Sequence, residues 1–104
     1  MRPYRDLKIG SVIQEELGKI LIKDFEFAGA FATIVGVEVS PDLLQARIKM
    51  SVIPENLDLP VFRALEERKR EFQHKLLKKM NIRPMPHIKF EIEKQENKEF
   101  EIEN

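Results

Sequence analysis

The feature that most constrains the fold of this chain is a strict alternation of apolar and polar residues near its middle. The apolar positions are Ala46, Ile48, Met50 and Val52, and the polar ones are Gln45, Arg47, Lys49 and Ser51. Successive side chains of a strand point to opposite faces of a sheet. The segment therefore predicts a strand with one buried face and one solvated, basic face, which other elements must cover on the apolar side.

The residues before this segment predict a second strand. Phe31–Val39 is rich in β-branched residues and is nearly all apolar until Glu38, which favours a strand in the centre of a sheet. Regular alternation would place five side chains on one face, namely Phe31, Thr33, Val35, Val37 and Val39. Gly36 is a candidate for a bulge or a close approach. The turn residues 40–42 would join the two strands into a hairpin.

Two further segments have apolar residues at the period of a helix. The first runs from about Arg5 to Lys23, with a stripe of Ile9, Ile13, Leu17, Ile20 and Leu21. The second runs from Leu59 to about Ile82, with a stripe of Val61, Leu65, Phe72, Leu76 and Met80. The charged residues 66–71 interrupt the second stripe. They are either a solvated turn of one long helix or a joint between two helices.

The C-terminal part of the sequence predicts a third strand followed by an acidic segment. Pro84 and Pro86 end the helical segment, because each proline disfavours the α region for the preceding residue. Residues 87–93 alternate as a strand. We therefore expect an α+β domain over residues 1–93, with helices packed on a three-stranded sheet in the order α-β-β-α(-α)-β. Residues 94–104 are acidic, and either extend the strand through Phe100 and Ile102 or form a tail.

Composition excludes several classes of protein. The 104 residues suffice for one domain, and the absence of cysteine rules out disulfides and thiolate metal sites. The longest uncharged stretch, residues 27–37, is too short to span a bilayer as a helix. No signal peptide is evident at the N-terminus. We expect a cytoplasmic protein without a membrane partner.

The formal net charge of zero is a cancellation between two unlike parts. Residues 1–90 carry 16 Lys and Arg against 12 Asp and Glu, whereas residues 91–104 carry 2 Lys against 6 Glu. A positive surface can therefore exist on a neutral chain.

No set of residues suggests catalysis. His74 and His87 are not at the spacing of metal ligands, and we expect the first on a helix surface and the second at the start of a strand. Ser40 and Asp42 lack a nearby base, and we expect their side chains to bond to backbone groups of their turn. No glycine-rich phosphate loop is present. We expect no enzyme activity, no metal, no cofactor and no small-molecule substrate.

Two strings resemble a known family. The first is Val37-Glu38-Val39-Ser40-Pro41-Asp42-Leu43, followed by Ala46 and Ser51-Val52. The second runs from Leu76 to Phe90 and contains Asn81-Ile82-Arg83-Pro84-Met85-Pro86. The first string is similar to the strand-turn-strand signature of ribosome-binding factor A, and the second is similar to that family's last helix and final strand. Ile22-Lys23-Asp24 is similar to the end of its first helix. The resemblance covers about residues 4–92.

The resemblance implies a KH-like domain of type II that binds the immature small (30S) ribosomal subunit and its 16S rRNA. Such a protein assists maturation without catalysis and is expected to be a monomer. The family has an Ala-x-Gly kink between its last two helices, and the corresponding positions here are Arg68-Lys69-Arg70.

The residues expected to contact RNA are basic. They are Arg68, Lys69, Arg70, Lys75, Lys78, Lys79 and Arg83 in or after the second helical segment, and Arg47 and Lys49 on the strand. Lysine and arginine displace counterions from phosphates. The alternative is an ordinary solvated surface with local ion pairs. An alternative function is a protein-interaction module that docks a partner through a sheet edge or the acidic tail.

Overall fold

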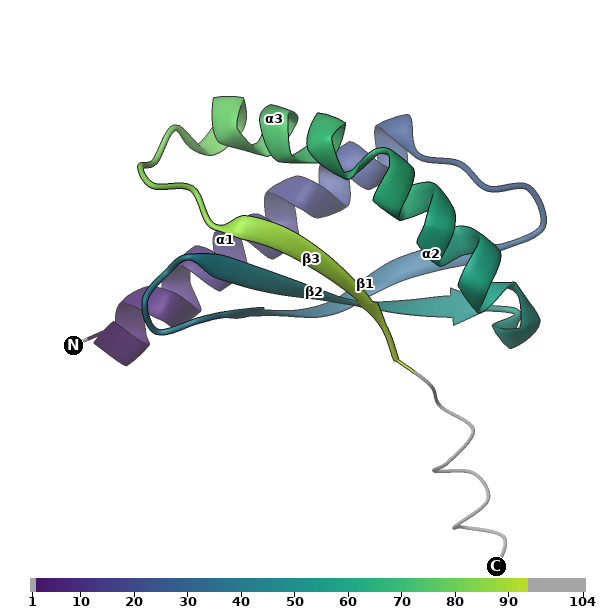
Figure 1. The fold of residues 1–104 in the computed structure, drawn as a ribbon, viewed down its shortest axis with the longest axis horizontal. Helices are drawn as coiled ribbons and strands as arrows, with labels where there is room; N and C mark the ends of the chain where they lie inside the picture. Colours follow the sequence, from purple (N-terminus) through teal and green to yellow (C-terminus); the bar gives the residue numbers. More distant parts are fainter. Residues whose placement is uncertain (1, 94–104) are drawn as a thin grey trace, which may run out of the picture.

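The computed structural model describes residues 2–93, with side chains from residue 8 onward. Its elements are α1 (Arg2–Asp24), β1 (Phe31–Val39), β2 (Gln45–Ile53), the short 3-10 helix η1 (Glu55–Leu57), α2 (Asp58–Glu67), α3 (Lys69–Met80) and β3 (His87–Ile92). The helices lie on one side of a three-stranded sheet (Figure 1). The expected α+β order is confirmed. The predictions for residues 94–104 lie outside the described residues.

The strand that shows the clearest alternation is the central one. The sheet order is β1-β2-β3, with β1 antiparallel and β3 parallel to β2. A parallel neighbour requires a crossover, and α2 and α3 supply it. The prediction that Phe31–Val39 occupies the centre of the sheet is wrong, because an apolar sequence does not fix sheet order. Within residues 2–93, β1 is an edge strand.

A bulge changes which side chains of β1 face the core. Ile34 pairs with Met50 and Gly36 pairs with Lys49, so Val35 is an extra residue on this strand. The predicted bulge near Gly36 is confirmed. The prediction of one shared face is wrong, because the bulge shifts the alternation. Phe31 and Val35 are exposed, whereas Val37 packs against the core.

The apolar face of β2 forms the floor of the core. Its four residues Ala46, Ile48, Met50 and Val52 are at most 5% exposed. Complete burial of one Ile or Met side chain contributes roughly 1.5–3 kcal/mol. The predicted helix stripes cover this floor, and Phe72 of α3 is fully buried. Its ring meets Phe25 and Phe90 edge-on, with centroids 6.2 and 6.4 Å apart.

The turn between β1 and β2 is held by the two side chains expected to stabilise it. The Gln45 backbone N–H donates to Ser40 Oγ at 3.1 Å, and the Leu44 N–H donates to Asp42 Oδ1 at 3.0 Å. The Ser40 hydroxyl also donates to Asp42 Oδ1. These bonds lower the pKa of Asp42, with the Ser40 bond the largest cause. The structural role predicted for this pair is confirmed.

Two glycines of α1 allow a test of how tightly the helix lies on the sheet. A Cβ at Gly18 would have no neighbour within 4 Å, whereas a Cβ at Gly10 would lie 3.3 Å from the Val37 carbonyl oxygen. Gly18→Ala should therefore stabilise the protein by about 0.5–1 kcal/mol through helix propensity. Gly10→Ala should give less or be destabilising, because it pushes α1 away from β1. Urea denaturation of both variants measures the difference, and an equal gain would contradict the close approach.

Candidate nucleic-acid interface

The second helical segment breaks at Arg68, which confirms the two-helix alternative. Arg68 has φ −106° and ψ 11° and separates α2 from α3. A negative φ of this kind is open to residues with a Cβ. The joint therefore forms at the position of the family's kink without a glycine or an alanine.

Arg68 ties this joint to the end of α1. Its Nε and Nη2 donate to the two Glu71 carboxylate oxygens at 2.9 and 2.7 Å, and its Nη1 donates to the Asp24 carbonyl oxygen at 2.6 Å. The guanidinium also lies over the Phe72 ring, 4.9 Å from its centroid. A bidentate pair of this kind fixes orientation as well as charge. The side chain is thus committed to the joint.

Lys75 completes the same network from the next turn of α3. Its Nζ lies 2.8 Å from Asp24 Oδ2 and 3.2 Å from Glu71 Oε2. Hydrogen bonds from Arg68 and then Lys75 lower the pKa of Glu71 to about 2. The bond to Asp24 is the main reason that the pKa of Lys75 is raised. Sequence patterns did not predict the part played by Asp24, because it lies 44 and 51 residues from its two partners.

Two more predicted contact residues are engaged in ion pairs. Lys69 Nζ lies 3.2 Å from Glu66 Oε1, and Lys79 Nζ lies 3.7 Å from Glu16 Oε1. Both pairs are only partly exposed, and the Oε1 atom that Glu16 presents to Lys79 is buried. They reduce the local positive charge that a phosphate would meet.

The remaining basic residues of the predicted helical set point outward. Arg70, Lys78 and Arg83 are exposed, and none forms an ion pair with a described side chain. Arg70, His74 and Lys78 recur every four residues along α3 and so share one helix face. Arg83 follows in the connection to β3. We call these four residues the α3 stripe.

Gln73 fixes the orientation of α3 relative to the sheet. Its Nε2 donates to the Pro86 carbonyl oxygen at 2.8 Å, and its Oε1 accepts from the Ile88 backbone N–H at 2.8 Å. The C-terminal end of α3 is set by Asn81, which has φ 53° in the left-handed region. The helix therefore stops before the prolines that were expected to end it, and Arg83 lies outside it.

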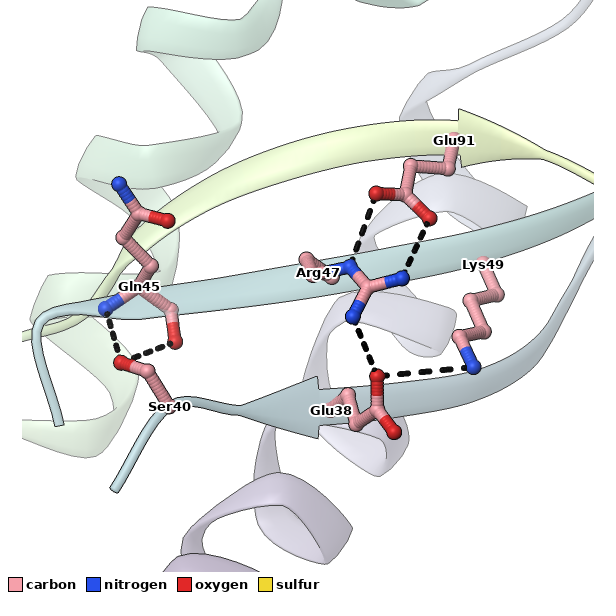
Figure 2. Close-up of polar contacts among 6 residues, drawn as sticks. All are labelled: Glu38, Ser40, Gln45, Arg47, Lys49 and Glu91. Atoms are coloured by element: carbon pink, nitrogen blue, oxygen red, sulfur yellow. Dashed lines mark hydrogen bonds and ion pairs between the residues drawn. The ribbon is translucent and has the colours of Figure 1, made fainter. Parts of the chain in front are cut away.

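Arg47 and Lys49 lie on the sheet face that the helices leave open, which we call the open sheet face (Figure 2). Arg47 contacts Glu38 Oε1 at 2.6 Å and Glu91 Oε2 at 2.9 Å, and Lys49 lies 3.6 Å from Glu38 Oε1. The hydrogen bond from Arg47 lowers the pKa of Glu91. The structure does not bring these two cations together with the α3 stripe, and carboxylates surround them.

The described part of the chain was also compared with the requirements of a metal site and of a membrane-spanning helix. Among residues 2–93, no group of three or more His, Asp or Glu side chains could hold a metal ion. His74 is exposed on α3 and His87 begins β3, as expected. In the same range, no helix is long and apolar enough to cross a bilayer.

The fold and the outward basic helix define the class of this protein as an α+β domain of KH-like arrangement. A model of the family described as ribosome-binding factor A matches residues 5–104. The chain therefore belongs to the ribosome-binding factor A family.

Individual relatives agree with this assignment. Ribosome-binding factor A of Rhodopirellula baltica is 32% identical over 103 residues, covering 93% of this chain and 73% of that protein. The protein of the same name from Chlorobium limicola is 35% identical over 89 residues, covering 83% of this chain and 75% of that protein.

Solved structures are similar in fold. The crystal structure of ribosome-binding factor A from Thermus thermophilus superposes with a TM-score of 0.73 at 18% identity, covering 84% of this chain and 94% of that one. A homology model of the Thermus thermophilus protein, fitted into a cryo-EM map of its complex with the 30S subunit, gives a TM-score of 0.67 at 20% identity. It covers 79% of this chain and 88% of that one.

The Arg68–Glu71–Lys75 network predicts a specific acid response. The folded pKa of Glu71 is about 2, below the ordinary value of 4.5, so its ion pairs stabilise the fold above pH 4.5 and are lost as the pH falls toward 2. Glu71→Gln should lower the free energy of unfolding at neutral pH. The gap from the wild type should narrow below pH 4.5 and close as the pH approaches 2.

Urea denaturation between pH 7 and pH 2 measures this gap. Glu67→Gln is the matched control, because Glu67 is an exposed glutamate of the same joint without an ion pair among the described side chains. A gap for Glu71→Gln that stays constant across the whole range would contradict the assignment.

Proposed function

We propose that the protein binds the small ribosomal subunit and its 16S rRNA during assembly, and that it does so without catalysis. Family membership supports a ribosome-binding factor. The related Thermus thermophilus protein has been fitted into a complex with the 30S subunit. The site of action would be the cytoplasm, where subunits mature.

The observation that carries the proposal at the level of residues is the α3 stripe. Arg70, Lys78 and Arg83 are the predicted cations that no described carboxylate neutralises. They can exchange water and counterions for phosphate oxygens without first breaking an ion pair. We therefore place the main RNA contact on the outer surface of α3 and the loop after it.

The paired cations have a secondary part in this proposal. Arg68 and Lys75 hold the joint between α2 and α3 against Asp24 of α1, so they orient the stripe. Lys69 could exchange its glutamate for a phosphate at the cost of the existing pair, whereas release of Lys79 would leave the buried Oε1 of Glu16 without its cation. Arg47 and Lys49 are the weakest candidates, because two glutamates lie beside them on the open sheet face.

The action on the ribosome would be stoichiometric. A protein that binds one arrangement of rRNA more tightly than the alternatives shifts the population toward that arrangement. Recognition would rest on backbone and shape, since three of the four residues of the α3 stripe are Arg or Lys and none is Phe, Tyr or Trp.

Removal of the stripe should weaken binding in a salt-dependent way. The triple variant Arg70→Ala, Lys78→Ala and Arg83→Ala should bind immature small subunits less tightly. The slope of log K against log salt should fall by roughly 0.7–0.9 for each phosphate that the variant no longer neutralises. Co-sedimentation with immature and mature subunits at two salt concentrations measures both quantities.

The matched control removes three cations from the open sheet face: Arg47→Ala, Lys49→Ala and Lys89→Ala. It changes the net charge by the same amount, so a general electrostatic effect would affect both variants equally. An unchanged slope for the α3 variant, with a reduced slope for the control, would move the interface to the sheet. Unchanged binding in both would refute RNA contact through these residues.

A further inference from the structure

His74 is the one residue of the α3 stripe that is not a permanent cation. It is exposed on α3 and lies four residues after Arg70 and four residues before Lys78. Residues four apart on a helix are neighbours, so the imidazole lies between two cations that have no carboxylate partner among the described side chains. A phosphate that both cations attract would therefore lie beside His74.

The carboxylate nearest to His74 in the sequence is already bonded to other side chains. Glu71 accepts hydrogen bonds from Arg68 on both of its oxygens, and Lys75 Nζ lies 3.2 Å from one of them. His74 itself forms no hydrogen bond or ion pair within the described range, residues 2–93. A positive charge on this imidazole therefore has no bonded anion in the protein, and a phosphate could supply one.

Most carboxylates of the neighbouring elements are also engaged elsewhere. Asp24 and Glu16 of α1 contact two other lysines of α3. Strand β3 presents its apolar side chains to the helices and its charged ones to the open sheet face. Glu67 is the exception, because it ends α2, seven residues before His74, and has no ion pair with a described side chain. A test of His74 must therefore include Glu67.

We propose that His74 binds an RNA phosphate as imidazolium, so that RNA binding takes up a proton at this residue. The inference rests on the proposed function of the α3 stripe. An imidazole ordinarily titrates between about pH 5 and pH 8, and a negative charge within about 4–6 Å favours its charged form. The proton comes from solvent and adds to the ring nitrogen that carries no hydrogen in the neutral imidazole, so both nitrogens then donate.

Proton uptake makes the affinity for RNA depend on pH in one direction. The bound state holds more protons than the free protein, so binding must tighten as the pH falls. The other three members of the stripe keep their charge at every pH in this range. The number of phosphates that the stripe neutralises should therefore rise by one between pH 8 and pH 6.

Two substitutions of His74 test the uptake in opposite directions. His74→Gln should bind immature small subunits like the wild type at pH 8 and roughly 3–10-fold more weakly at pH 6. His74→Lys carries a permanent charge, so it should bind more tightly than the wild type at pH 8 and about equally at pH 6. Comparison of variants on the same subunits removes the titration of the subunits themselves, and co-sedimentation measures each affinity.

The salt dependence supplies a second measurement that a merely structural role would not change. Between pH 8 and pH 6, the slope of log K against log salt should steepen by roughly 0.7–0.9 more for the wild type than for His74→Gln. His87→Gln is the matched control, because His87 is the only other histidine and is exposed at the start of β3, outside the stripe. His87→Gln and Glu67→Gln should both keep the response of the wild type.

The outcomes separate this inference from the function on which it rests. If the triple alanine variant of the α3 stripe loses affinity but His74→Gln keeps the full pH response, the stripe binds RNA and the proton uptake is refuted. A loss for His74→Gln that is equal at both pH values refutes it too, as does a response that disappears in His87→Gln or Glu67→Gln. If the triple variant binds like the wild type at both pH values, the function and the inference fall together.

Discussion

The burial of one face of β2 governs where the other elements of this fold can lie. Ala46, Ile48, Met50 and Val52 are all removed from water, so α1, α2 and α3 must lie on the same side of the sheet (Figure 1). Two surfaces are left as a result. One is the outer surface of α3, which is basic, and the other is the open sheet face, which is mixed in charge and apolar at its β1 end.

The joint at Arg68 determines how the basic surface is presented. A guanidinium that bonds Glu71, the Asp24 carbonyl oxygen and the Phe72 ring holds α2, α3 and the end of α1 in one arrangement. The same contacts occupy the cation, so Arg68 is a positioning residue in the proposed function. The joint is thus stabilised by hydrogen bonds from the Arg68 guanidinium, which has five N–H donors, and not by a small residue with more backbone freedom.

The distribution of charged residues along the sequence predicted where the candidate site lies but not which of its cations are neutralised. The sequence identified a basic helical segment, and α3 carries it. It could not show which cations are neutralised, because Asp24 and Glu16 approach Lys75 and Lys79 through tertiary contacts from α1. Local pairs could be predicted, because residues three or four apart on a helix are neighbours, as Arg68 and Glu71 are. That Arg70, Lys78 and Arg83 have no carboxylate partner among the described side chains is therefore a finding of the structure.

Local patterns were enough to predict the helical segments, the strands, their order and the buried row of β2, because alternation and helical period follow from local backbone geometry. The position of β1 at the sheet edge and the loss of a shared face at its bulge were decided by tertiary structure. So were the contact of Arg68 with Asp24 and the pairing of Lys75 and Lys79 with Asp24 and Glu16. Each of these depends on groups far apart in the chain, whose approach no local pattern records.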